Sequence, residues 1–412
     1  MKSLPRLIVA AAAIVCAAPS VARAELPTLT QAIEAAKTHA LVVVEAEEQV
    51  HVANAQMKGA RLSAIGNPYI DLQVDKGFGN GVQQELQVLT YSYIPIDVAG
   101  QRGKRVDEAE RLIAWRKMGL TSSEWIAAGE AAAAYGELLV SSSRVVEAKA
   151  GEATAREEAK YFQGRYDAKD TTLYEKSIAE AEVARWVQSR AEAELRVASS
   201  RARFEQVTGM LTDGSPPAPA SVLLPALRGT WDDGQIARVV DRAPSISRLA
   251  AEKSYWDASI ERYEREKIPP VSFEIIAGRG SAGEARLGGG AVFTFPVTRR
   301  YQAEIARAES GREHAHRQLD LYRGIVVTRL RAARDAIAAV NRALDELDKN
   351  GIPALERAVS TSVEAFRAGK IDLTRAMLAR RDLAIARARR LDLLEASWRA
   401  YADLLIFSGE LP

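Results

Sequence analysis

The feature that most limits how this chain can fold is a long stretch without proline. From about Gly103 to Gln163 the sequence is rich in Ala, Glu, Arg and Leu, which are strong helix formers. A helix of about 60 residues would be roughly 90 Å long, whereas an average globular helix has only about 11–12 residues. The sequence therefore predicts an elongated molecule rather than a compact one.

Shorter helices flank this long one. We expect a first helix at about Leu29–Leu62, and two others at Thr172–Val207 and Asp232–Glu264. A helix of about 35 residues is roughly 53 Å long, so two of them stacked end to end match the long helix. We therefore expect Thr172–Val207 and Asp232–Glu264 to run together beside it.

The second half of the chain contains a comparable long helix with an interruption. The helical pattern runs over Gln302–Asn350 and resumes as far as Ala365, with Gly351, Ile352 and Pro353 between the two parts. Proline removes a backbone donor and clashes with the preceding turn. We therefore predict a kink at Pro353.

The two halves of the chain resemble each other at an offset of about 200 residues. The matching pairs of segments are Tyr166–Leu173 with Phe366–Leu373, Ile94–Ile96 with Phe295–Val297, Gln101 with Gln302, and His39–Ala40 with Arg242–Ala243. Units of this length are too long for a solenoid repeat. We interpret the pattern as a tandem duplication, with a first structural repeat at 25–213, a linker at 214–228 that contains "GSPPAPA", and a second repeat at 229–412.

Each repeat also contains two segments with the alternation of a strand. In the first repeat these segments lie at about 69–74 and 84–94, separated by "DKGFGNG". In the second repeat they lie at about 271–275 and 291–295, separated by the loop "GRGSAGEARLGGG" at 278–290. The expected order in each repeat is helix, strand, strand, long helix, helix, in a fold that is mainly α with a small β part.

Four strands cannot close a barrel, since about eight are needed even for a small filled one. An open sheet with long exposed edges tends to aggregate. Several copies of the chain are therefore expected to pool their strands into a barrel. Strands of about 9–11 residues have the length that crosses a bilayer.

The first 24 residues have the pattern of a secretory signal peptide. Lys2 and Arg6 precede an apolar run, and Ala22–Ala24 forms a cleavage site of the A-x-A type. Cys16 lies inside this segment and follows a valine, which disfavours lipid attachment there. The chain has 56 Lys and Arg against 54 Asp and Glu, and three of the basic residues belong to the signal. This balance argues against a nucleic-acid partner.

No group of residues in the sequence has the pattern of an enzyme active site. His314 and His316 are two residues apart in a helical stretch, so they do not share a helix face, and no cysteine or third histidine accompanies them. Gly100, Gly103 and the run Gly288–Gly290 lack the lysine and serine or threonine of a phosphate-binding loop. We therefore expect neither catalysis, nor a metal site, nor a cofactor.

Three segments resemble the TolC-type outer-membrane efflux factors, and most nearly their heavy-metal branch. They are "GIPALERAVSTSVEAFRAGKIDLTRAMLARRDLAIA" at 351–386, "YSYIPIDVAGQRGKRVDEAE" at 91–110 and "FTFPVTRRYQAEIARAE" at 293–309. The resemblance implies a homotrimer with a 12-stranded barrel in outer-membrane lipid and a long α-helical barrel in the periplasm. It further implies a periplasmic adaptor protein and an inner-membrane pump, of the RND type, which together export solutes such as heavy-metal cations or drugs. A type I secretion duct and a soluble periplasmic coiled-coil scaffold are the alternatives.

The same resemblance implies that the helical turn of each repeat forms the periplasmic tip and contacts the adaptor. By position the second tip consists of Ala368, Gly369, Lys370, Ile371, Asp372 and Leu373, and the first of Ala168, Lys169, Asp170, Thr171 and Leu173. Lys169 stands where the second tip has glycine, and a left-handed backbone is uncommon for such a residue, so we expect the first turn to be shaped differently. Arg367 and Asp167 are candidates for an aperture or lock. Asp372 is expected to cap the returning helix, although the acids of both tips could instead form a constriction that selects cations.

Overall fold

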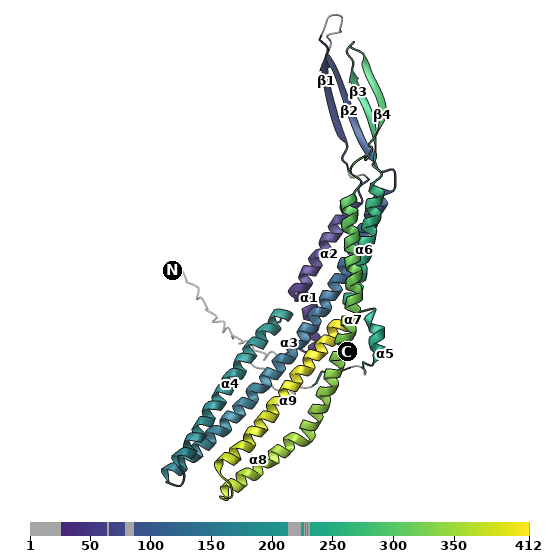
Figure 1. Ribbon diagram of the computed structural model, residues 1–412. Helices are drawn as coiled ribbons and strands as arrows, with labels where there is room; N and C mark the ends of the chain where they lie inside the picture. The colour runs from purple at the N-terminus through teal and green to yellow at the C-terminus, as the bar shows by residue number, and fades with distance from the viewer. Residues whose placement is uncertain are drawn as a thin grey trace, which may run out of the picture.

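The chain folds into an elongated molecule with a sheet at one end and two helical turns at the other (Figure 1). This computed structural model describes residues 26–63, 66–78, 86–212, 224–225, 227, 229 and 231–411. The signal segment at 1–24 lies outside the described residues, as do most of the linker at 214–228 and the first hairpin loop.

The fold is mainly α with a small β part, and the elements follow the same order in both halves, as the sequence predicted. The first half contains α1 (Leu29–His39), α2 (Leu41–Ala60), β1 (Tyr69–Lys76), β2 (Leu86–Ile96), α3 (Gln101–Asp167) and α4 (Leu173–Thr208). The second half contains α5 (Asp233–Val240), α6 (Pro244–Glu266), β3 (Val271–Arg279), β4 (Ala285–Phe293), α7 (Gln302–Glu346), a π-helical turn η1 (Leu347–Gly351), α8 (Ile352–Arg367) and α9 (Leu373–Ser408).

The central helix α3 has 67 residues, which corresponds to about 100 Å. Its buried face is made of small residues, and Ala127, Ala128 and Ala131 are fully buried. Glycine allows still closer packing, because a Cβ atom on Gly136 would lie 2.1 Å from the ring of Trp398. Close approach of neighbouring helices therefore holds the middle of the molecule together.

The first helix of each repeat is interrupted, which corrects the single helices predicted at Leu29–Leu62 and Asp232–Glu264. Ala40 separates α1 from α2 with ψ 136°, and Ala243 separates α5 from α6 with ψ 138°. These two alanines are the residues that the internal alignment pairs. In the second repeat Pro244 explains the break, because the residue before proline avoids helical geometry.

The helices that return from the turns end at these interruptions. α4 stops at Gly209 and α9 at Gly409, both with left-handed backbones. A Cβ atom on Gly209 would lie 3.2 Å from His39, and one on Gly409 would lie 2.6 Å from Pro244. The helix stacked on α4 is therefore α2 of the same repeat. The prediction that Asp232–Glu264 continues Thr172–Val207 was wrong.

The four strands form one antiparallel sheet in the order β1-β2-β3-β4. β4 begins at Ala285, so the run Gly288–Gly290 lies inside the strand and pairs with β3. The loop is therefore shorter than the one predicted at 278–290, because β3 ends at Arg279 and β4 begins at Ala285. Among the helices of the described residues, none combines the length and the apolar character needed to cross a membrane.

The two faces of the sheet differ in chemistry. Side chains alternate between faces along a strand, and directly paired residues share a face. The apolar face carries Ile70, Leu72, Val74, Phe273, Ile275, Leu287 and Phe293, all of them exposed. The polar face carries Tyr69, Asp71, Gln73, Asp75, Tyr91, Tyr93, Glu274 and Arg286.

The junction from strand to long helix is built alike in both repeats. The amide side chain of Gln101 accepts a hydrogen bond from the backbone N–H of Ala99 at 2.8 Å, and Gln302 accepts one from Arg300 at 2.9 Å. A left-handed residue precedes each glutamine, Gly100 in one repeat and Tyr301 in the other. The internal alignment of Gln101 with Gln302 thus corresponds to one structural role.

The predicted interruption of the second long helix is present. Backbone hydrogen bonding changes at η1, where the N–H of Ile352 donates to the carbonyl of Leu347, one residue further back than in an α-helix. Pro353 follows in the first turn of α8, where its missing N–H costs little. Figure 1 shows that the chain bends here, as it passes from α7 into α8.

Candidate functional site: the helical turns and the groove above them

The two turns at the far end have the same backbone geometry. In the first turn, the backbone N–H of Asp170 donates to the carbonyl of Arg165, and the N–H of Lys169 donates to the carbonyl of Tyr166. In the second turn, the N–H of Lys370 donates to the carbonyl of Ala365. These bonds form the Schellman motif, whose left-handed residue is usually glycine. Lys169 has φ 61° and Gly369 has φ 69°. The expectation that the first turn is shaped differently was therefore wrong.

Side chains hold Lys169 in this uncommon conformation. The guanidinium of Arg165 donates to the Asp170 carboxylate and to the Asp170 carbonyl, both at 2.8 Å. The hydrogen bond to the Asp170 carboxylate raises the pKa of Arg165 above its usual value. Thr172 then begins α4 with a capping box that includes Glu175. The first turn thus uses side-chain contacts where the second uses glycine.

The second turn has fewer side-chain hydrogen bonds than the first. Nothing lies within 4 Å of the position that a Cβ atom on Gly369 would occupy, so backbone conformation alone favours glycine there. The carboxylate of Asp372 accepts a hydrogen bond from the backbone N–H of Arg375 at 2.8 Å. This bond confirms the predicted role of Asp372 as a helix cap.

The two turns pack against each other. The rings of Phe162 on α3 and Phe366 on α8 have centroids 5.8 Å apart. Leu373 joins Phe162 and Ala179 in a small buried cluster, with 7% of its surface exposed. Its counterpart Leu173 is 59% exposed, so equivalent positions in the two repeats have different surroundings.

The structure does not join the two residues proposed as a lock. Arg367 and Asp167 are both exposed, and no ion pair involves Arg367 within the described part of the chain. Asp167 accepts a hydrogen bond from Gln163 at 2.8 Å. Of the other predicted tip residues, Thr171 and Ile371 are half-buried, whereas Ala168, Asp170, Ala368 and Lys370 are exposed. Their contact with an adaptor stays a prediction.

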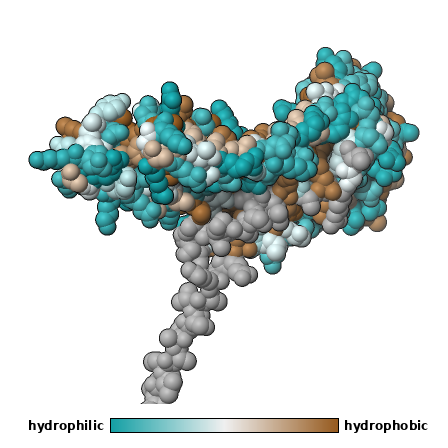
Figure 2. All heavy atoms as spheres, turned by 90° about the horizontal axis from the view of Figure 1, so that it is seen from below, coloured by the Kyte–Doolittle hydropathy of each residue, from teal (hydrophilic) through white to brown (hydrophobic). Residues whose placement is uncertain are grey.

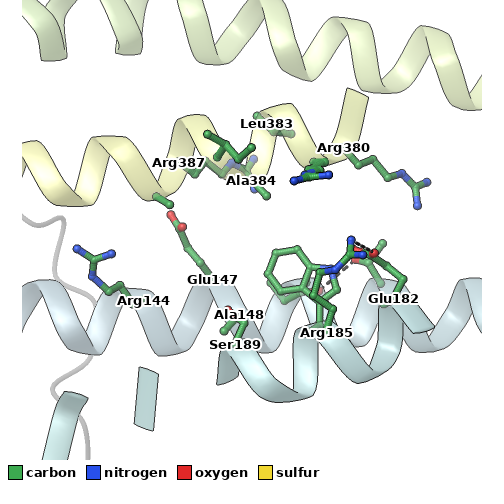
Figure 3. Close-up of a pocket in the computed structure, with 18 of the residues that line it drawn as sticks. Arg144, Glu147, Ala148, Glu182, Arg185, Ser189, Arg380, Leu383, Ala384 and Arg387 are labelled. Carbon is green, nitrogen blue, oxygen red and sulfur yellow. Dashed lines mark hydrogen bonds and ion pairs between the residues drawn. The ribbon is translucent and has the colours of Figure 1, made fainter. Parts of the chain in front are cut away.

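A groove that sequence reasoning missed lies between the hairpin α3–α4 and the hairpin α8–α9 (Figure 3). Its volume is about 750 Å³. The lining includes Arg144, Glu147, Gly151, Glu158, Arg185, Trp186, Val359, Met377, Arg380, Ala384 and Arg387. These residues come from four helices and have no common spacing, so no local pattern in the sequence could have shown them together.

The charged groups of this groove are partly withdrawn from water. Glu147 points from α3 toward α9 (Figure 3), and burial raises its pKa despite three nearby arginines. Burial lowers the pKa of Arg380, which pairs with Glu158 across the groove. Gly151 lets the ring of Trp186 lie close against α3. The groove therefore offers both arginine side chains and an apolar floor.

The two histidines considered in the sequence lie on the polar surface of α7. Nδ1 of His316 lies 3.8 Å from a carboxylate oxygen of Asp320. Within the described ranges, no cluster of three or more His, Cys, Asp or Glu side chains could hold a metal ion. The surface seen from the turn end is largely hydrophilic, with scattered hydrophobic residues (Figure 2).

Comparison with known proteins places this architecture. No protein-family model matches the sequence, and no curated protein matches it. Among solved structures, CusC, described in connection with transmembrane channel formation, matches with a TM-score of 0.74 at 12% identity, over 93% of this chain and 92% of that one. The Campylobacter jejuni CmeC outer membrane channel matches with 0.73 at 13% identity, over 92% and 85%.

This chain has the fold of those channels. The Neisseria gonorrhoeae MtrE outer membrane channel in its open state matches as well, with a TM-score of 0.72 at 15% identity, over 93% of this chain and 89% of that one. Each of these matches extends over more than nine-tenths of this chain, and they agree with the resemblance seen in the sequence.

Proposed function

We propose that this chain is the outer-membrane channel of a tripartite efflux system. The observation that carries the proposal is the two-faced sheet at the end of the long helices. Its apolar face exposes Ile70, Leu72 and Ile275, which suits contact with lipid, while its polar face suits a water-filled lumen. A soluble scaffold would have no use for such an exposed apolar face.

Closure of the sheet requires further copies of the chain. β1 and β4 are the two edges, and they run in opposite directions. β4 of one copy can therefore pair with β1 of the next in the antiparallel manner of the other strands. A homotrimer of this kind gives the 12-stranded barrel, and its α3–α4 and α7–α9 hairpins together form the periplasmic helical barrel.

The turns then lie at the periplasmic end of the channel. There the residues around Lys169 and Gly369 contact an adaptor protein, which links the channel to an inner-membrane pump of the RND type. The channel passes the solutes that the pump selects, such as heavy-metal cations or drugs. No chemistry of its own is required, and the chain acts as a transporter component rather than an enzyme.

A matched pair of variants tests the membrane assignment. Ile275→Arg places a charge on the apolar face near the middle of β3, and Gln73→Arg places one on the polar face of β1. Arginine facing lipid at mid-membrane costs about 2–4 kcal/mol, so we expect Ile275→Arg to reduce the trimer recovered from detergent-extracted outer membranes, with Gln73→Arg close to wild type. Recovery of the wild-type chain only as a soluble periplasmic monomer would contradict the proposal.

A further inference from the structure

The polar face of the sheet carries a tyrosine cluster at the end nearest the helices. Tyr69 and Tyr93 face each other across β1 and β2, with stacked rings 4.6 Å apart between centroids. Tyr91 continues the stack, with its ring centroid 6.5 Å from that of Tyr93. A tyrosine side chain combines an apolar ring, whose face is electrostatically negative, with a polar hydroxyl.

Two carboxylates flank the tyrosine cluster on the same face. Asp71 lies directly opposite Tyr91, and Glu274 lies directly opposite Tyr93 on the other side. Within the described part of the chain, neither carboxylate forms an ion pair. The guanidinium of Arg286 belongs to this face, but it lies toward the hairpin turn and pairs with Glu284 at 2.7 Å.

The glycine run of β4 explains how Glu274 is placed. Gly290 is the direct partner of Glu274 in the sheet, and a Cβ atom on Gly290 would lie 2.9 Å from a carboxylate oxygen of Glu274. The glutamate side chain therefore lies across the bare backbone of β4. A larger residue at this position would displace the carboxylate from its place beside the tyrosines.

Resting on the proposed function, we infer that the tyrosine cluster with Asp71 and Glu274 is a selectivity element that favours organic cations in the lumen. Cations are attracted to the faces of aromatic rings, and quaternary ammonium groups are recognised by aromatic side chains. The carboxylates add charge attraction, which is long-ranged in a lumen with low-dielectric walls. A small inorganic ion gains only the charge attraction, because it keeps its water shell.

A block experiment on the purified channel in planar bilayers tests this inference. The probe is benzyltriethylammonium, added to a channel that carries potassium current, and benzenesulfonate serves as a ring-bearing anion. We expect the ammonium probe to reduce the current and the sulfonate to leave it unchanged. Tyr93→Leu should raise the half-blocking concentration at least about threefold, and Glu274→Gln should raise it as well.

Two controls separate a direct effect from a folding defect. Tyr93→Phe keeps the aromatic ring but loses the hydroxyl that bonds Glu274, so its half-blocking concentration should stay below that of Tyr93→Leu. Ser92→Ala changes the neighbouring residue on the lipid-facing side without an expected effect. Equal block of wild type and Tyr93→Leu would overturn the inference while leaving the channel assignment intact. Absence of any conductance in the wild-type protein would overturn the channel assignment and the inference with it.

Discussion

The turns of the first and second repeats reach the same backbone shape by different means. The first uses Lys169 in a left-handed conformation, held by the contacts of Arg165 with Asp170. The second uses Gly369 and has open space around it. The fold thus fixes the path of the chain at both turns, while side chains decide how firmly each turn is held.

The helices that lead into the two turns, α3 and α8, also differ in how firmly they are packed. α3 reaches its turn as an unbroken helix with many buried residues, including Phe162 close to the end. α8 follows the π-helical turn η1 and contains no buried residue. Ion pairs hold this region to α9, among them Arg390 with Asp348 at 2.7 Å and Arg387 with Glu356 at 2.8 Å. The second hairpin should therefore open more easily than the first.

The largest difference in stability between the turns is expected at the leucines that begin α4 and α9. Leu373→Ala removes a buried side chain and should lower the local opening free energy of its turn by about 2–4 kcal/mol. Leu173→Ala removes an exposed one and should change it by less than about 0.5 kcal/mol. Hydrogen exchange at the start of α9 and of α4 measures both. Similar costs at the two positions would remove the proposed asymmetry.

A smaller effect is expected at the left-handed positions. Gly369→Val forces a branched side chain into the left-handed region. That conformation costs roughly 1–2 kcal/mol for a residue with a Cβ atom, and branched residues adopt it even less often than others do. We expect faster exchange at the second turn and loss of export, with trimers retained. Wild-type export by this variant would show that the turn tolerates strain.

A glycine introduced at the first turn should slow hydrogen exchange there. Lys169→Gly relieves the left-handed strain at the first turn, but the added freedom of glycine in the unfolded chain offsets part of the gain. We expect exchange at the first turn to slow by an amount equivalent to at most about 1 kcal/mol. Faster exchange in this variant would mean that the lysine side chain itself stabilises the turn.

The smallest expected effect concerns the groove between the two hairpins. Burial raises the pKa of Glu147 above its usual range, so the folded state holds its proton more tightly than the unfolded state. This carboxyl therefore lowers stability progressively as the pH rises past about 4.5. Glu147→Gln should reduce the loss of thermal stability between acidic and neutral pH. Glu157→Gln, an exposed change on the same helix, is the matched control and should leave the pH profile unaltered.

Much of the architecture could be predicted because the sequence repeats itself and its patterns are local. The helix from Gly103 onward, the alternation near Ile70 and Val271, and the break before Pro353 all depend on neighbouring residues. The duplication then supported element assignments for which the pattern in a single repeat is weak. It paired Gln101 with Gln302, which the structure shows in the same role.

The features that were missed depend on contacts between distant segments. The break at Ala40 has no proline or glycine to mark it, although its partner Ala243 precedes Pro244 and could have been used. The run Gly288–Gly290 suggested a loop, whereas pairing with β3 makes it a strand. Lys169 suggested an altered turn, because the support from Arg165 and Asp170 is visible only in three dimensions. The groove near Trp186 required the packing of four helices.

The joints at Gly209 and Gly409 make the reach of this molecule adjustable. α4 and α9 end there against the interrupted first helices, so each long hairpin below the joint is continuous with the upper part only through α3 or α7. Whole turns added in register to both arms of a hairpin would lengthen it by about 5.4 Å each, without disturbing the sheet or the helices above. Hairpin length can therefore differ between proteins of this fold while the sheet and the helices above the joints stay the same.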